Sequence, residues 1–298
     1  MKAILLAPVD LLWNGGIGTY VKAATETHAE AGDKANDSIR VDGQDLRCKA
    51  VGEGGNLGLT QRGSDRVRIQ SGGRINTDFI DNSAGVDTSD HEVNIKILLD
   101  RVTAAGDMTE KQRNSLLASM TDEVADLVLE DNYGQNLALA SAEAGAKPLM
   151  HVHESWIRRL ERRGSDRPRD RVPAQRQGLR RPARRQALPL TAPELSVLLA
   201  YTKIVLAAEL LTTDLPDDPF MRGEVHRYFP SEMRTAYLDR DGLSSACVAR
   251  SSSPRSSTTW STSLASRSFT GSAKRRVPPS RSWPGRTSSV GAFTSPTS

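Results

Sequence analysis

The sequence predicts an α/β unit over residues 1–100, a mainly α-helical region after it, and a disordered C-terminal tail. Residues 1–100 contain short apolar runs that end in glycine-rich loops and alternate with helix-like segments, which is typical of α/β proteins. From about residue 89 the apolar residues recur at helical spacing behind capping signals. Residues 244–298 contain 18 serines but no Asp, Glu, Ile or Met. So little apolar surface cannot offset the entropy lost when that length of chain is ordered.

Each element of the α/β unit is predicted from an apolar run and the turn residues that bound it. Glycine-rich loops at 14–18 and 53–58 each follow such a run, and Gly32 closes the first helix. The expected elements, in chain order, are a buried strand at 9–13, a helix at 19–31, two strands at 39–41 and 46–51 around a tight turn at Asp42-Gly43, and a strand at 75–80.

Three capping patterns predict where helices begin, because a Ser or Thr followed three residues later by Glu or Gln can bond reciprocally with the first turn. The pairs are Ser89 with Glu92, Thr109 with Gln112, and Thr191 with Glu194. They predict helices over 101–163 and again over 189–243. An Arg- and Pro-rich segment at 164–188, which lacks a periodic apolar face, separates the two helical regions and is expected to be disordered.

The formal charge of +4 is distributed in blocks. The net charge is −7 over 1–160 and −4 over 189–243, against +7 over 161–188 and +8 over 244–298. No predicted folded part is basic, so the pI of 9.2 is weak evidence for a nucleic-acid partner. No aromatic stacking platform accompanies the arginines either, and a nucleic-acid ligand is therefore not expected.

Other features limit the protein's environment and chemistry. Cys48 and Cys247 lie too far apart in the sequence to indicate a disulfide framework or a zinc site. The most apolar stretch, 195–211, is interrupted by Lys203 and Glu209, which favours a buried helix over a membrane span. The N-terminal apolar run is too short for a secretion signal. We expect a cytoplasmic protein without a membrane anchor.

Two loops are candidate ligand sites. Glu53-Gly54-Gly55-Asn56 follows a predicted strand, and its glycines would allow the backbone to approach a ligand closely. An ordinary turn explains the same spacing. The second loop, Asn82 to Ser89, ends at a predicted helix start, where Ser89 is most simply an N-cap but could also bind a carboxylate.

Two further patterns are weaker. Asn14-Gly15-Gly16-Ile17-Gly18 lacks the full spacing of a phosphate-binding loop. His151 and His153 are two residues apart, so on a helix they would not face one metal ion. No metal site is expected.

Taken together, four runs resemble the large bacterial NAD-dependent glutamate dehydrogenases. They are VDLLWNGGIGTYVK at 9–22, KAVGEGGNLGLT at 49–60, GRINTDFIDNSAGVDTSDHE at 73–92 and LTAPELSVLLAYTK at 190–203. The resemblance covers about residues 1–163 and 189–240. It implies that residues 1–100 are the second half of a Rossmann-like, NAD-binding domain. The family reaction oxidises L-glutamate with NAD to 2-oxoglutarate and ammonium, and the full-length enzymes are expected to be homo-oligomers.

The resemblance also assigns roles to individual residues. It places Asn56 at the nicotinamide ribose, Asn82 between nicotinamide and substrate, and Ser89 at a glutamate carboxylate. The remaining residues that it assigns to the coenzyme are Asn14, Gly15, Gly16, Gly54 and Gly55. Gly55 stands where the smaller glutamate dehydrogenases have Ala. The family's catalytic lysine and aspartate lie upstream of the matched text, so no catalytic residue is expected here and the isolated chain is expected to be inactive.

Three segments do not match the family: 64–71, 164–188 and 244–298. High-GC coding DNA read out of frame yields much Arg, Ser, Pro and Gly and few acids. We therefore predict that these segments are frameshifted translations. If neither of the other two frames gives acid-containing amphipathic helices, this hypothesis is wrong. The alternatives are a basic-tailed nucleic-acid-binding protein and a non-catalytic helical interaction module.

Overall fold

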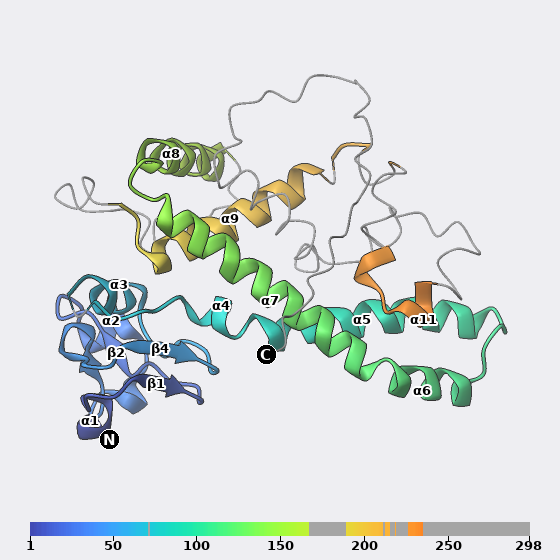
Figure 1. Cartoon of the computed structure of the whole chain (residues 1–298), viewed down its shortest axis with the longest axis horizontal. Coiled ribbons are helices and arrows are strands. Elements are labelled where there is room, and N and C mark those ends of the chain that lie inside the picture. The colour runs from blue at the N-terminus through green and yellow to red at the C-terminus, as the bar shows by residue number, and fades with distance from the viewer. Residues whose placement is uncertain (71, 167–188, 211, 215–217, 219–225, 235–298) are drawn as a thin grey trace, which may run out of the picture.

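A computed structural model describes residues 1–70, 72–166, 189–210, 212–214, 218 and 226–234. Its α/β part lies at one end of the molecule, and helices α5 (Ser83–Ala104) and α6 (Glu110–Ser119) reach the other end (Figure 1). The predicted disordered segments fall outside the described residues, apart from 164–166. Those three residues belong to helix α8 (Met150–Asp166).

Two small parallel sheets form the α/β part. Strand β1 (Leu11–Asn14) pairs with β4 (Ala50–Glu53), and β2 (Val21–Lys22) pairs with β3 (Val41–Asp42). Both pairings are parallel, and the first aligns Asn14 with Glu53 at the carboxyl ends of the strands. An α/β organisation is confirmed at this level, whereas the assignment of residues 1–100 to the second half of a Rossmann-like, NAD-binding domain stays a prediction.

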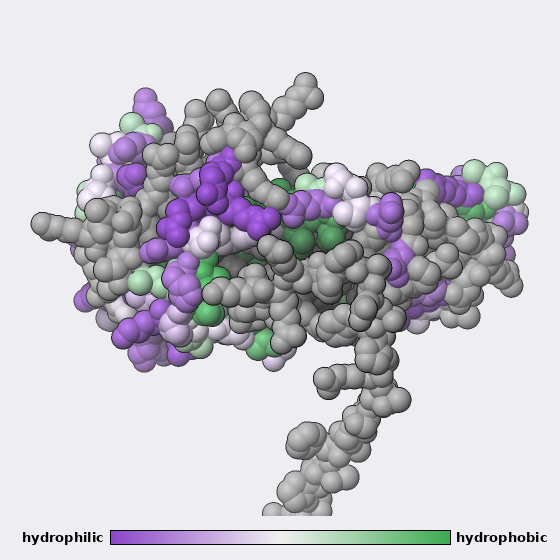
Figure 2. Space-filling view, turned by 90° about the horizontal axis from the view of Figure 1, so that it is seen from above, coloured by the Kyte–Doolittle hydropathy of each residue, from purple (hydrophilic) through white to green (hydrophobic). Residues whose placement is uncertain are grey.

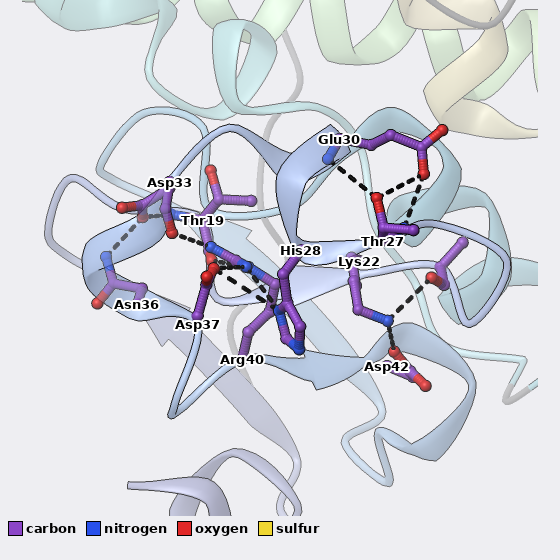
Figure 3. Close-up of polar contacts among 11 residues, drawn as sticks. Thr19, Lys22, Thr27, His28, Glu30, Asp33, Asn36, Asp37, Arg40 and Asp42 are labelled. Atoms are coloured by element: carbon purple, nitrogen blue, oxygen red, sulfur yellow. Dashed lines mark hydrogen bonds and ion pairs between the residues drawn. The ribbon is translucent and has the colours of Figure 1, made fainter.

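The segment between β1 and β4 is held by polar contacts more than by regular structure (Figure 3). It contains α2 (His28–Ala31) and the short 3₁₀ turns Lys34–Asn36 and Gly43–Asp45. The Arg40 side chain is fully buried, and its Nε donates to the Thr19 carbonyl at 2.7 Å. Its Nη1 lies 2.5 Å from Asp37 Oδ1. Since each polar group of the buried guanidinium needs a partner, this network fixes the path of the segment.

Helices make up the rest of the described chain. Besides α5, α6 and α8 they are α1 (Lys2–Leu5), α3 (Gln61–Gln70), α4 (Asp78–Asp81), α7 (Thr121–Ala144), α9 (Ala192–Leu210) and α11 (Ser231–Met233). Helix α7 packs against both α5 and α9, and α3 packs against α9. Three apolar clusters result: one in the α/β part, one between α5, α6 and residues 228–233, and one that α4 and α7–α9 share.

Two of the three predicted capping boxes are confirmed. Thr109 caps α6 and exchanges hydrogen bonds with Gln112. Thr191 precedes α9, and its backbone N–H donates to Glu194 Oε2 at 2.8 Å. Such boxes form locally, and so they can be recognised from sequence.

The third capping box is wrong, because α5 begins at Ser83 with Asn82 as its N-cap. The amide of Asn132, on α7, donates to the Ile80 carbonyl at 3.0 Å and to Ser83 Oγ at 2.7 Å. These contacts fix the first turn of α5 six residues before Ser89. Tertiary packing therefore makes residues 83–89, which were predicted to be a loop, helical.

Several predicted elements of the α/β unit also need correction. The helix at 19–31 is confined to His28–Ala31, because the Tyr20–Lys22 backbone instead bonds to Gly58 and β3. Asp42-Gly43 does not join two antiparallel strands, since β3 pairs with β2 and a 3₁₀ turn follows it.

The strand predicted at 75–80 is replaced by α4, and only Arg74 just before it makes a bridge, to Ala50. The carboxylates of α4 accept backbone N–H groups from the last residue of β4 and from the loop after it, which an extended strand would not place there. The strand at 9–13 is β1, but it is not buried: Leu11 is 54% exposed and Trp13 61%. These two side chains share one open face of the β1–β4 sheet.

Residues 64–70, part of a segment predicted to be a frameshifted translation, form most of α3, and Val67 among them takes part in the core. The side chain of Val67 is fully buried, and Asp65 Oδ1 accepts a hydrogen bond from Thr191 Oγ1 at 2.8 Å. The frameshift hypothesis for this segment stays a prediction, although Ser64, Asp65 and Val67 are buried in the fold.

The face at the top of Figure 1 is largely hydrophilic where its residues are described (Figure 2). Among the described residues no helix is long and apolar enough to cross a membrane.

Candidate functional site

The carboxyl ends of β1 and β4 bring the two glycine-rich loops together. Asn14 and Glu53 are register partners, and each is the last residue of its strand. The backbone N–H groups of Gly54 and Gly55 both donate to the Asn14 carbonyl at 2.9 Å. The structure therefore places the predicted coenzyme residues of both loops side by side.

Close packing of the loops explains two of the predicted glycines. A Cβ on Gly55 would lie 2.4 Å from the Gly16 carbonyl oxygen, which real structures do not allow. A Cβ on Gly54 would lie 2.6 Å from the Trp13 ring. Gly16 itself has open space around it. The absence of a side chain at 55, where the smaller enzymes have Ala, follows from the approach of the loop at 14–18.

A buried carboxyl group lies beneath the loop at 53–58. Glu53 is 2% exposed, and its Oε2 accepts the Gly58 N–H at 2.9 Å. Burial, together with the nearby charges of Asp78 and Asp81, raises the pKa of Glu53 to about 7. The Glu53 carboxyl group therefore changes between its protonated and ionised forms near neutral pH.

The loop is anchored to α4 by two further carboxylates. The Glu53 N–H donates to Asp81 Oδ2 at 3.0 Å, and the Leu57 N–H donates to Asp78 Oδ2 at 2.8 Å. Burial also raises the pKa of Asp81. Three acidic groups in one place would repel a pyrophosphate, whereas uncharged ribose hydroxyls and amides would not be repelled.

Asn56 and Asn82, predicted to bind coenzyme and substrate, touch each other. Asn82 Nδ2 donates to Asn56 Oδ1 at 3.0 Å. Asn82 is the N-cap of α5, but its side chain does not cap the helix, so the amide is directed to the loop after β4. Two residues 26 positions apart thus form one polar surface at the end of the sheet.

Ser89 is exposed on α5 and is not at its N-terminus. Its hydroxyl faces the Gly85 carbonyl at 3.5 Å. Seven residues separate it from Asn82, which amounts to two helical turns, or about 10 Å along nearly the same face. A carboxylate at Ser89 would therefore gain little from the helix dipole, which acts within the first turn.

A second polar cluster, which the sequence did not reveal, lies inside the helical region. It contains Asp87 and His91 of α5, Asp131 of α7 and Lys203 of α9. Asp87 and His91 are four residues apart and so share one helix face, the only signal available in the sequence. His151 of α8 is exposed, whereas His153 is buried and not part of a solvated helix face.

Comparison with known proteins identifies the family. Residues 1–142 match the family model of the bacterial NAD-glutamate dehydrogenase catalytic domain, and residues 187–240 match that of the glutamate dehydrogenase C-terminal region. The chain belongs to the bacterial NAD-dependent glutamate dehydrogenases, a family of oxidoreductases.

Three curated relatives are each called NAD-specific glutamate dehydrogenase. The identity is 53% over 240 residues for the Halomonas elongata protein, 52% over 240 residues for that of Pseudomonas aeruginosa, and 49% over 239 residues for that of Mycobacterium tuberculosis. Each match covers 80% of this chain. The chain spans only 14–15% of the length of these relatives.

Proposed function

We propose that this chain is part of an enzyme that oxidises L-glutamate with NAD to 2-oxoglutarate and ammonium. Within it, the loops at 14–18 and 53–58 and the start of α5 would form the nicotinamide-ribose side of the coenzyme site. The observation that carries this proposal is the Asn56–Asn82 contact at the carboxyl ends of two parallel strands. In open α/β sheets, ligands bind at this edge.

The residues at this edge fit the nicotinamide-ribose part of NAD better than its pyrophosphate. Asn56, Gly15 and Gly16 are exposed and offer amide and backbone groups that can donate to and accept from ribose hydroxyls. The carboxyl groups beneath the loop disfavour phosphate at the same place. Bound NAD would accept the hydride from the glutamate α-carbon, and the protein's contribution would be to hold the two reactants in position.

Asn82 and Ser89 would define the substrate side. Both lie on one face of α5, so a substrate lying along the first two turns would meet the Asn82 amide and then the Ser89 hydroxyl. A hydroxyl donates well to a carboxylate even without help from a helix N-terminus. The proposal further includes a cytoplasmic location and a homo-oligomeric full-length enzyme.

Isothermal titration of the purified chain with NAD tests the coenzyme role. We expect Asn56→Ala and Asn82→Ala to weaken NAD binding about tenfold or more, which corresponds to the loss of one good hydrogen bond to the ligand. Asn114→Ala, at an exposed position on α6, is the matched control and should leave binding unchanged. Equal affinity in all three variants would show that NAD binds elsewhere.

Activity is tested separately, by following NADH formation at saturating glutamate. We expect none from the chain alone, and some after addition of a polypeptide that carries the preceding part of a relative. Glutamate-dependent NADH formation by the chain alone would disprove the expectation of inactivity. Binding that falls steeply with salt to DNA or RNA would instead favour the nucleic-acid alternative, which the family match does not support.

A further inference from the structure

The interface of α5 and α7 contains a compact set of metal-ligand side chains. Asp87 and His91 extend from α5, and Asp131 extends from α7. One ligand atom of each residue lies within 4.8 Å of those of the other two. Asp87 is 5% exposed and His91 is 1% exposed, so this is an interior site and not a solvated acidic surface.

The second observation is that two of these side chains lack hydrogen-bond partners. Neither ring nitrogen of His91 has a partner among the described residues, and Asp87 Oδ2 has none either. Burying a polar atom without a partner is costly, and such atoms are rare in native proteins. A metal ion between the residues would satisfy Asp87 Oδ2 and one of the two ring nitrogens of His91.

The His91 ring is held by stacking. It lies parallel to the Tyr228 ring, with centroids 4.2 Å apart and an interplanar angle of 10°. The Tyr228 hydroxyl in turn accepts a hydrogen bond from the Asn94 amide at 2.8 Å. The plane of the imidazole is thereby fixed while its nitrogens remain available to bind an ion.

We propose that Asp87, His91 and Asp131 bind a divalent transition-metal ion of the zinc type, which cross-links α5 to α7. Two carboxylates and one imidazole are ligands that Zn²⁺ accepts, at about 2.0–2.2 Å from each donor atom. Donor atoms arranged tetrahedrally around one Zn²⁺ are about 3.4 Å apart, so atoms that now lie within 4.8 Å of one another would have to move together by up to roughly 1.4 Å. This site was not expected from the sequence.

Lys203 is the natural competitor of the ion. Its Nζ donates to Gln135 Oε1 at 2.7 Å, and its charge acts on both Asp87 and Asp131. The negative charge of Asp87 and Asp131 can thus be balanced by the Lys203 ammonium or by a metal ion.

Titration of the chelator-treated full chain with Zn²⁺ alone distinguishes these states. We expect one ion to bind, with a dissociation constant in the micromolar range or below, and to raise the thermal midpoint. His91→Asn and Asp131→Asn should weaken binding about 100-fold. His151→Asn, at an exposed histidine of α8, should bind as the parent does. Co²⁺ bound to the parent and to His151→Asn should give visible absorption. The same absorption should be absent from His91→Asn and Asp131→Asn.

Lys203→Met keeps the experiment decisive if the other variants fold poorly. Removal of the competing ammonium should tighten Zn²⁺ binding about tenfold. Three results would overturn the proposal: no stoichiometric binding by the parent, equal binding by His91→Asn, or a Lys203→Met variant that loses stability and binds no metal. The last result would show that the ammonium alone neutralises the cluster. None of these readouts depends on NAD binding.

Discussion

Replacing Glu53 with Gln should stabilise the protein, and increasingly so as the pH rises. The buried carboxyl group is protonated below its pKa of about 7, whereas the same group in the unfolded chain ionises near 4.5. The folded state therefore binds more protons between these two values, and stability falls as the pH rises through them. A Gln side chain keeps an oxygen for the Gly58 N–H and never ionises.

The size of the effect follows from the shift. Moving a carboxyl pKa from 4.5 to about 7 disfavours the ionised form by about 3 kcal/mol. Of this, about 2 kcal/mol should develop between pH 5 and pH 8. Asp87, whose pKa burial also raises to about 7, gives a slope of the same sign. His91, whose pKa burial lowers to about 4, opposes both below neutral pH. Both terms cancel when variant and parent are compared.

The assay is urea denaturation, followed by circular dichroism, at several pH values between 5 and 8. Glu53→Gln should gain stability relative to the parent over this range. Glu143→Gln is the matched control, because Glu143 is half-buried and pairs with Arg68 at 2.6 Å. That variant should be slightly less stable at every pH. If the difference between Glu53→Gln and the parent does not change with pH, the carboxyl group is not buried as described.

Three further substitutions test the packing by the same denaturation assay. Gly55→Ala should lower the free energy of unfolding by about 1–3 kcal/mol, since the new Cβ would meet the Gly16 carbonyl, whereas Gly16→Ala, which meets nothing within 4 Å, should not. Leu199→Ala, at a fully buried site, should lower it by about 2–5 kcal/mol, against little change for the exposed Leu137→Ala. Thr109→Ala should cost about 1 kcal/mol, because the cap of α6 is lost. Equal effects within a pair, or no effect at Thr109, would contradict the packing described.

Local signals in the sequence predicted local structure. The boxes at Thr109 and Thr191 were found because the bonding partners lie three residues apart. The two parallel strands that end in glycine loops were also found. The start of α5 was not, because Ser83 becomes helical through contacts with Asn132, which is 49 residues away. The strand predicted at 75–80 was likewise wrong, because the carboxylates of α4 bond to backbone N–H groups at and after the end of β4.

The candidate site was predicted in part for the same reason. The loops bearing Asn56 and Asn82 could be named from sequence, and the structure brings these two residues into contact. Their contact could not be derived, since it depends on how α5 meets the sheet. The cluster around His91 was missed because Asp131 and Lys203 come from other helices, which the spacing of Asp87 and His91 on α5 does not indicate.

The packing of α3 against α9 has a consequence for how the chain can be divided. The two regions matched by separate family models, 1–142 and 187–240, share one interior through this contact and through that of α7 with α9. The hydrogen bond between Asp65 and Thr191 is one point where they meet. A single protease cut between 167 and 188 should therefore leave two fragments that migrate together on gel filtration. The protein should also tolerate expression as two separate genes whose products reassemble.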